Sequence, residues 1–185
     1  MNQDDSLLLD FYLGVGTDHM NRSLEEILRK DDRWLEQTHD YIQWLFPLYV
    51  GSKFNPNAPL LTDEVRAAFS DDEHPNNAEL RKNFGRAIQR MLVFYGYFNG
   101  PLSPDEVEPT GEWRNKADNW LSDGNHNYMR ITRMLRCMTL LGRHKLAVSF
   151  RDALVDAASV HPKEISQRTI GFWNEAVVPI PDDPE

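Results

Sequence analysis

The sequence has little cysteine, no long apolar run and no excess of positive charge, and each shortage excludes a class of protein. Cys137 is the only cysteine among 185 residues, so an intrachain disulfide and a multi-cysteine metal site are both excluded. No apolar stretch approaches the roughly 18 residues that a bilayer-spanning helix needs. Residues 1–5, MNQDD, lack the basic and apolar regions of a signal peptide. We therefore expect a soluble, cytoplasmic protein without stable membrane insertion.

Positive charge is scarce relative to negative charge. Acidic residues outnumber basic residues 29 to 20, which gives a formal net charge of -9. This excess opposes attraction to nucleic acid and to anionic membranes, so we predict no nucleic-acid partner. A Gly-rich phosphate loop is also absent, because Gly14 and Gly16 follow a predicted helix rather than a strand. The sequence thus predicts no cofactor, no metal and no recognisable catalytic motif.

Strand patterns are missing as well. Valine and isoleucine are sparse, period-two alternation is absent, and apolar residues recur at intervals of three and four. This pattern predicts an all-α fold, with one compact domain over residues 1–178 and an acidic tail over residues 179–185. Short connections in the C-terminal half favour an antiparallel helical stack there. Residues 99–112, rich in proline and acids, are expected to form an exposed connector.

About eight to nine helices are expected from the apolar spacing and the end signals. Ser23 with Glu26 has the spacing of a capping box, and Thr62 is a second N-cap. The expected helices cover residues 5–13, a short stretch after Ser23, and residues 31–45, 62–69, 77–98, 112–121, 126–141, 143–158 and 162–177.

Two of these helices carry polar residues at the border of an apolar face. The candidate ligand-binding residues are His39, Asp40, Gln43 and Trp44 on the first helix and His126, Arg130 and Arg133 on the second. An enclosed arginine needs a carboxylate or several carbonyls. Candidate partners are Glu36, Asp40, Asp118 and Asp123. Trp44 projects away from the apolar stripe of its helix, so it must cover a loop, line a groove or contact a partner.

Four segments resemble the conserved domain of the opioid growth factor receptor family. They are LLDFY at 8–12, HDYIQWLFPL at 39–48, MLVFYG at 91–96 and HNYMRITRML at 126–135. The resemblance implies a mostly helical domain and, for the animal receptors, binding of an enkephalin-type peptide by a nucleus-associated protein that restrains proliferation. Because this chain stops soon after Val178 and has no basic localisation cluster, it resembles the stand-alone, receptor-related proteins of bacteria. No catalytic residues carry over from the family.

Three functions remain open at this stage. The first is a non-enzymatic ligand- or peptide-recognition domain, in which Asp40 meets an amine, the Arg130 and Arg133 pair meets a carboxylate or another small anion, and Trp44 and Gln43 line the groove. The second is a helical interaction or scaffold domain whose Arg, Asp and His residues form a buried network, with a possible homodimer. The third is a metal-assisted enzyme that uses His39 and His126.

Overall fold

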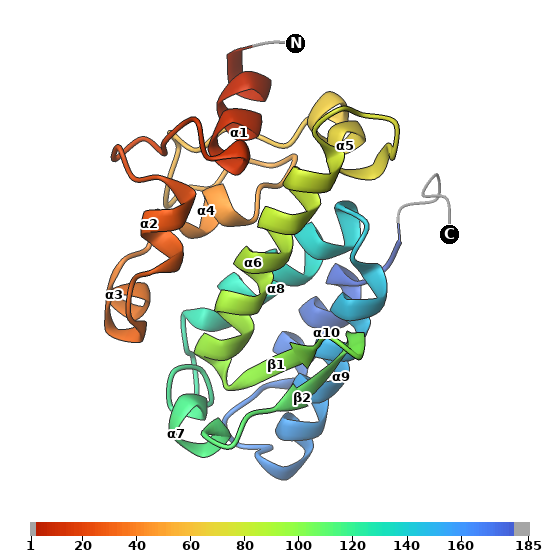
Figure 1. The fold of residues 1–185 in the computed structure, drawn as a ribbon. Coiled ribbons are helices and arrows are strands. Elements are labelled where there is room, and N and C mark those ends of the chain that lie inside the picture. Colours follow the sequence, from red (N-terminus) through yellow and green to blue (C-terminus); the bar gives the residue numbers. More distant parts are fainter. Residues whose placement is uncertain (1–2, 180–185) are drawn as a thin grey trace. The chain divides into compact units, whose positions relative to one another are not determined.

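The computed structural model describes residues 3–179, and the chain divides into two compact units, residues 1–90 and 91–185 (Figure 1). Helix α6, Asn77–Tyr95, contributes its first part to unit 1 and its last turn to unit 2. Among the described residues no helix is both long enough and apolar enough to cross a bilayer. The predicted acidic tail lies outside the described residues apart from Pro179.

Unit 1 is built from short helices that end close to the signals in the sequence. Its elements are α1 (Gln3–Leu13), α2 (Leu24–Leu28), α3 (Asp32–Gln37), α4 (Ile42–Leu45), α5 (Asp63–Ser70) and the first part of α6. Ser23 forms the predicted capping box with Glu26, and the Thr62 side chain caps α5. The core is an aromatic cluster of edge-to-face pairs, formed by Tyr12, Phe69 and Phe84.

The predicted helix over residues 31–45 is broken, which is a correction to the sequence analysis. Helix α3 ends at Gln37, Thr38 has an extended backbone, and α4 begins only at Ile42. The break has a tertiary cause, because the Asp40 carbonyl accepts a hydrogen bond of 2.6 Å from the Asn55 side chain. His39 and Asp40 therefore lie on a loop and not on a helix face.

Unit 2 contains the other long helices and a hairpin. Its elements after α6 are β1 (Tyr97–Gly100), β2 (Ser103–Pro109), α7 (Trp113–Ala117), α8 (Asn127–Leu140), α9 (His144–Val160) and α10 (Gln167–Ala176). Helix α8 packs against α9 and α10, and β2 packs against α9. Trp120 and Trp173 are fully buried between these elements, and the Trp120 indole donates to the Tyr95 carbonyl at 3.0 Å.

The all-α prediction is wrong because β1 and β2 form an antiparallel sheet, so the fold is mixed α/β. The residues expected to form a connector pair instead, with Phe98 opposite Glu108 and an irregularity before Gly100. One hydrogen bond attaches the hairpin to α9: the Val107 amide donates to the Ser149 hydroxyl at 2.9 Å. Because few strand side chains are buried, the segment lacks the alternating pattern that identifies a strand.

Candidate functional site

The seven predicted site residues divide between the two units. His39, Asp40, Gln43 and Trp44 belong to unit 1, and His126, Arg130 and Arg133 belong to unit 2. Each group has its own contacts within its unit. Binding of a ligand by any of them stays a prediction.

Asp40 is bound by two residues that the sequence analysis missed. Arg22 donates to the Asp40 carboxylate at 2.9 Å, and His19 Nε2 lies 3.4 Å from its other oxygen. Arg22 also contacts the buried Asp18 carboxylate, through Nε at 2.7 Å and through a second nitrogen at 2.6 Å. Burial opposes the charge of Arg22, but hydrogen bonds to both carboxylates raise the pKa of its guanidinium. One arginine therefore binds two carboxylates and offsets part of their combined negative charge.

His19 connects Asp40 to Trp44. The Trp44 indole N–H donates to His19 Nδ1 at 3.2 Å, and the planes of the two rings are nearly parallel, at 8°. Because an indole nitrogen only donates, Nδ1 must accept and Nε2 carries the proton of the neutral ring toward Asp40. The spacing of Asp18 and Arg22, four residues apart, was the sequence signal for this network, but it lies in a loop where face analysis does not apply.

Trp44 and Gln43 point inward. Trp44 is 2% exposed and Gln43 is 5% exposed, so neither side chain is presented at the surface. The Gln43 amide donates to the Ser52 hydroxyl at 3.3 Å. The Trp44 indole contacts His19 on the loop after α1, and a binding role for Trp44 stays a prediction.

In unit 2 the predicted residues lie along α8. Arg130 is 6% exposed and donates to the Asn127 side chain at 3.2 Å, whereas His126 is exposed at the helix start. Burial lowers the pKa of the half-buried Arg133. One turn further on, burial raises the pKa of the Cys137 thiol, which keeps it protonated and unreactive at neutral pH.

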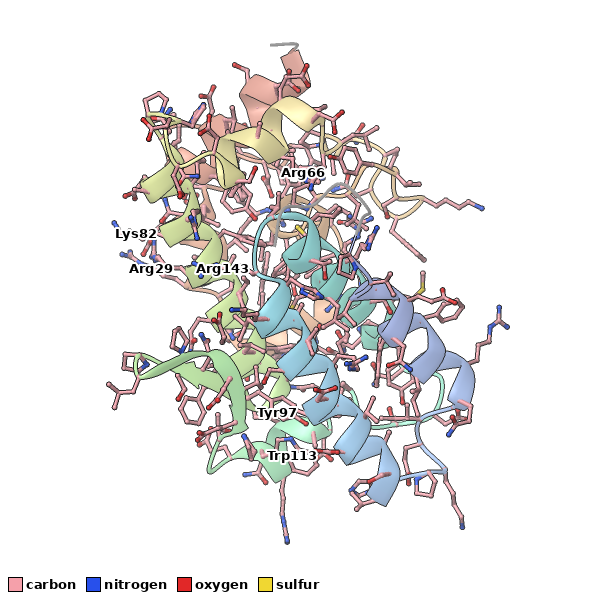
Figure 2. The ribbon with its side chains drawn as sticks, turned by 90° about the vertical axis from the view of Figure 1, so that its right-hand side faces the viewer. Arg29, Arg66, Lys82, Tyr97, Trp113 and Arg143 are labelled. Carbon is pink, nitrogen blue, oxygen red and sulfur yellow. The ribbon has the colours of Figure 1, made fainter. Side chains whose placement is uncertain are left out.

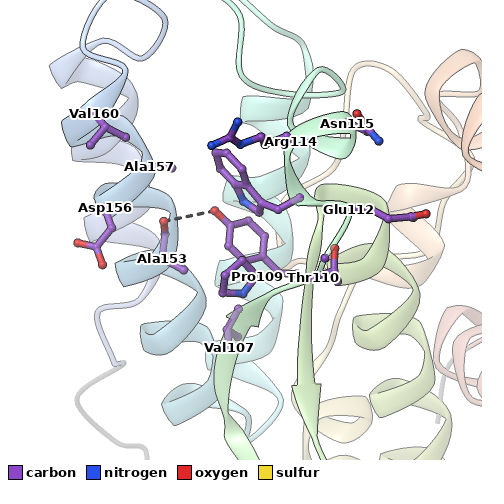
Figure 3. Close-up of a pocket in the computed structure, with 13 residues that line it drawn as sticks. Val107, Pro109, Thr110, Glu112, Arg114, Asn115, Ala153, Asp156, Ala157 and Val160 are labelled. Carbon is purple, nitrogen blue, oxygen red and sulfur yellow. Dashed lines mark hydrogen bonds between the residues drawn. The ribbon is translucent and has the colours of Figure 1, made fainter.

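Unit 2 also has a groove that the sequence analysis did not predict. It has a volume of about 800 Å³ and lies between the end of β2, the start of α7 and the last turns of α9 (Figure 3). The lining residues are Tyr97, Val107, Pro109, Thr110, Gly111, Glu112, Trp113, Arg114, Asn115, Ala153, Asp156, Ala157 and Val160. Such a volume is typical of small-molecule and side-chain binding sites.

The groove has an aromatic floor and charged edges. The Tyr97 and Trp113 rings contact edge to face, with centroids 6.3 Å apart (Figure 2). The Tyr97 hydroxyl donates to the Ala153 carbonyl, and burial together with the Asp156 charge raises its pKa to about 12. Arg114 is exposed and extends from α7 toward α9. The groove thus combines an apolar surface with a neutral hydroxyl, one cation and two carboxylates.

The groove is assembled by contacts distant in sequence. Gly96 has a φ of +92°, which turns the chain from α6 into β1, and its carbonyl accepts from the Thr110 amide at 2.8 Å. A side chain at Gly96 would meet Trp113 Cα at 3.2 Å and Lys116 Cβ at 3.0 Å. The glycine therefore lets α7 pack against the start of the hairpin.

A metal site is not evident in the part of the chain that the structure describes. Within residues 3–179 no group of three or more His, Cys, Asp or Glu side chains is placed to hold an ion. His39 and Asp40 belong to unit 1 and His126 to unit 2, and the metal-assisted function stays a prediction.

The chain is similar to a family of known proteins. Residues 1–178 match the family described as the opioid growth factor receptor (OGFr) conserved region. Opioid growth factor receptor-like protein 1 of Mus musculus is 33% identical over 135 residues, which cover 71% of this chain and 26% of the relative. The opioid growth factor receptor of Rattus norvegicus is 35% identical over 122 residues, 64% of this chain and 20% of the relative. No solved structure matches the chain.

The matched segment is a small part of each relative. The human opioid growth factor receptor is 33% identical over 108 residues, which cover 58% of this chain and only 15% of that protein. The chain thus spans about a quarter or less of the length of these curated relatives. The match over residues 1–178 confirms the resemblance carried by the four sequence segments, and the chain belongs to the family of the opioid growth factor receptor conserved region.

Proposed function

We propose that this family member is a non-enzymatic peptide-recognition domain whose binding site is the groove between β2, α7 and α9. The observation that carries the proposal is the groove itself, preformed and floored by two aromatic rings. Apolar pockets with a few polar groups are the usual form of a recognition site. Two relatives are named as opioid growth factor receptors, and a receptor has a binding role.

The chemistry of the lining favours binding over catalysis. Tyr97 is the most buried polar group of the groove, and its raised pKa keeps the hydroxyl neutral at physiological pH. It can therefore donate or accept a hydrogen bond but is a poor base. Thr110 and Asn115 add neutral hydrogen-bonding groups at the edge.

The groove replaces the binding surface first expected around Trp44. Trp44 and Gln43 are buried, and Asp40 is engaged with Arg22 and His19. An incoming amine would have to displace Arg22 from Asp40 and so would cost an existing ion pair. The ligand reaches the groove without breaking any of these pairs.

Selection of random heptapeptides on the purified chain tests the proposal. Enriched peptides are synthesised and their affinities measured by calorimetry for the wild type and for Ala153→Leu, which fills the groove wall. Ser159→Leu adds the same side chain on α9 outside the lining and is the matched control. We expect Ala153→Leu to bind the selected peptides with at least tenfold lower affinity than the wild type, and the control to bind them with unchanged affinity. Failure to enrich a peptide, or equal binding by Ala153→Leu, would overturn the proposal.

A second candidate function, a helical interaction domain that forms a homodimer, is favoured by the loop after α4. This loop exposes Val50 at 75% and Phe54 at 70%, although it is held in place by the Asn55 side chain and by a bridge between Ser52 and Asn55. An exposed aromatic on a rigid loop is typical of an interface anchor. Sedimentation of the wild type and of Phe54→Ser tests it: dimers lost in the variant support the candidate, and a wild-type monomer rejects it.

A further inference from the structure

Two carboxylates line the groove, and three more lie on β2, the strand that contributes to one of its walls. We define the acidic edge as Asp105, Glu106 and Glu108 on β2, Glu112 before α7, and Asp156 on α9. Within residues 3–179 none of these side chains makes an ion pair, and all but Asp156 fall in a stretch of eight residues that contains no lysine or arginine. The acidic edge is thus an uncompensated cluster that adjoins a preformed groove.

The acids of unit 1 are arranged differently. Glu25 contacts Arg29 and Arg86, Asp32 pairs with Arg90 at 2.9 Å, and Asp72 pairs with Arg81 at 2.9 Å. Among the described residues, several surface carboxylates of unit 1 thus have an arginine partner within the chain, which those of the acidic edge do not. The acidic edge also differs in that its carboxylates gather beside a groove, so a basic partner bound there would compensate several of them at once.

The geometry of a strand brings these charges within range of one another. Residues along a strand rise about 3.3 Å each, so the three β2 carboxylates lie within about one Debye length at physiological salt. Their potentials add, and a bound cation relieves repulsion among several of them at once.

We propose that the ligand of the groove is a basic extended peptide segment, with an apolar or aromatic side chain on the Tyr97 and Trp113 floor and flanking Lys or Arg side chains on the acidic edge. The inference rests on the proposed function and specifies its ligand class. Charge complementarity identifies the occupant, because the aromatic floor accepts an apolar group or a cation and the edge repels acidic segments.

Arg114 determines where the basic residues can lie along the bound peptide. Its guanidinium extends over the groove and repels a cation placed at the centre, so the basic residues belong at the ends of the bound segment. The guanidinium has five donors, which can bind main-chain carbonyls of an extended peptide. The expected pattern is therefore an apolar centre between basic flanks.

Anisotropy of labelled probe peptides tests the inference. The basic probe is acetyl-Lys-Arg-Ala-Phe-Ala-Arg-Lys-amide, and the acidic probe replaces its four charged residues with glutamate. We expect the basic probe to bind the wild type, the acidic probe not to bind, and affinity to fall at least tenfold between about 0.05 M and 0.3 M salt. Glu112→Gln/Asp156→Asn, which neutralises the two carboxylates that line the groove, should weaken binding several-fold. Glu64→Gln/Glu73→Gln, two exposed glutamates of unit 1, is the matched control and should have no effect.

The outcomes separate this inference from the proposed function. If the random selection yields groove-dependent peptides without basic residues, or if Glu112→Gln/Asp156→Asn binds the basic probe as well as the wild type does, the ligand class is wrong and the recognition site stands. If the basic probe binds Ala153→Leu as tightly as wild type, attraction is by surface charge alone and the inference fails. If no peptide depends on the groove, the proposed function itself is overturned.

Discussion

Arg22 is the residue on which the polar cluster of unit 1 depends. Its guanidinium contacts the Asp18 carboxylate, whose side chain is fully buried, and the half-buried Asp40. It also lies 5.3 Å from the centroid of the Trp34 ring, where a cation is attracted to the ring face. A single side chain thus holds the loop after α1 and the break between α3 and α4.

Replacing Arg22 with alanine should cost about 3 kcal/mol in the free energy of unfolding, because a buried carboxylate then loses its partner. Arg22→Lys should recover only part of this, since an ammonium lacks the planar fork. Urea denaturation measures both. Arg33→Ala, at an exposed position of α3, is the control and should change stability by less than about 0.5 kcal/mol. A loss no larger than that of the control would contradict the role assigned to Arg22.

The raised pKa of Tyr97 predicts that the folded protein loses stability in alkaline solution. Burial and the Asp156 charge raise the pKa of its hydroxyl to about 12, whereas an unfolded tyrosine ionises near pH 10. The unfolded chain therefore loses this proton first, so the stabilisation is complete below about pH 10 and is lost as the pH rises toward about 12. A shift of about two units corresponds to roughly 3 kcal/mol for this one group.

The comparison of wild type with Tyr97→Phe isolates this contribution. Denaturation is measured at about pH 9 and at about pH 11.5, a window that spans the unfolded value. The stability of Tyr97→Phe should fall less over this interval, because the variant has no proton to lose at this position. Parallel falls in the two proteins would show that Tyr97 is not the group responsible.

At the scale of elements, the junction between α6 and β1 positions the groove. The chain reverses at Gly96, the hairpin closes back onto its carbonyl through Thr110, and α7 begins directly after that contact. Because Trp113 is the first residue of α7, the direction of the turn at Gly96 determines where the aromatic floor lies.

Alanine substitutions at two glycines with similar backbone angles test the role of this junction. Gly96 has a φ of +92° and Gly142 a φ of +75°, but a side chain would meet α7 only at Gly96. Alanine at either position should cost about 1 to 2 kcal/mol for the left-handed conformation. Gly96→Ala should cost at least about 1 kcal/mol more, because α7 must also shift. Thermal denaturation measures the stability of both variants. Equal losses of stability would mean that α7 can shift without an energetic penalty.

At the scale of the whole molecule, the charge of -9 selects partners. Lysines and arginines of unit 1 are largely used in internal pairs, for example Arg86 with Glu25 and Arg90 with Asp32. A phosphate backbone would therefore find few unpaired cations in that unit, and the acidic edge of unit 2 would repel it.

We expect no binding of labelled duplex DNA at about 0.15 M salt, where counterion release already weakens nonspecific complexes. Anisotropy titration with the full chain measures it, and the basic probe peptide is the positive control under the same conditions. Saturable DNA binding at micromolar protein would reject this expectation and would indicate a basic surface that the pairs described above do not account for.

The sequence by itself determined the family, most helix boundaries and the caps, because these depend on neighbours within a few residues. Ser23 with Glu26 and Thr62 with Val65 are contacts over three positions, and both are present in the structure. The start of α6 at Asn77 was also predicted to the residue. Helical spacing is a local property, so it can be recognised in the sequence without knowledge of the tertiary structure.

Only the tertiary structure decided the broken helix, the hairpin and the groove. The Asn55 side chain binds the Asp40 carbonyl from 15 positions away, and Ser149 binds the Val107 amide from 42 positions away. Such contacts depend on which distant segments meet, and no local pattern encodes them. The seven predicted site residues were chosen from the faces of predicted helices. Their partners and the groove depend on how loops pack, and loop residues have no helical periodicity from which such contacts could be predicted.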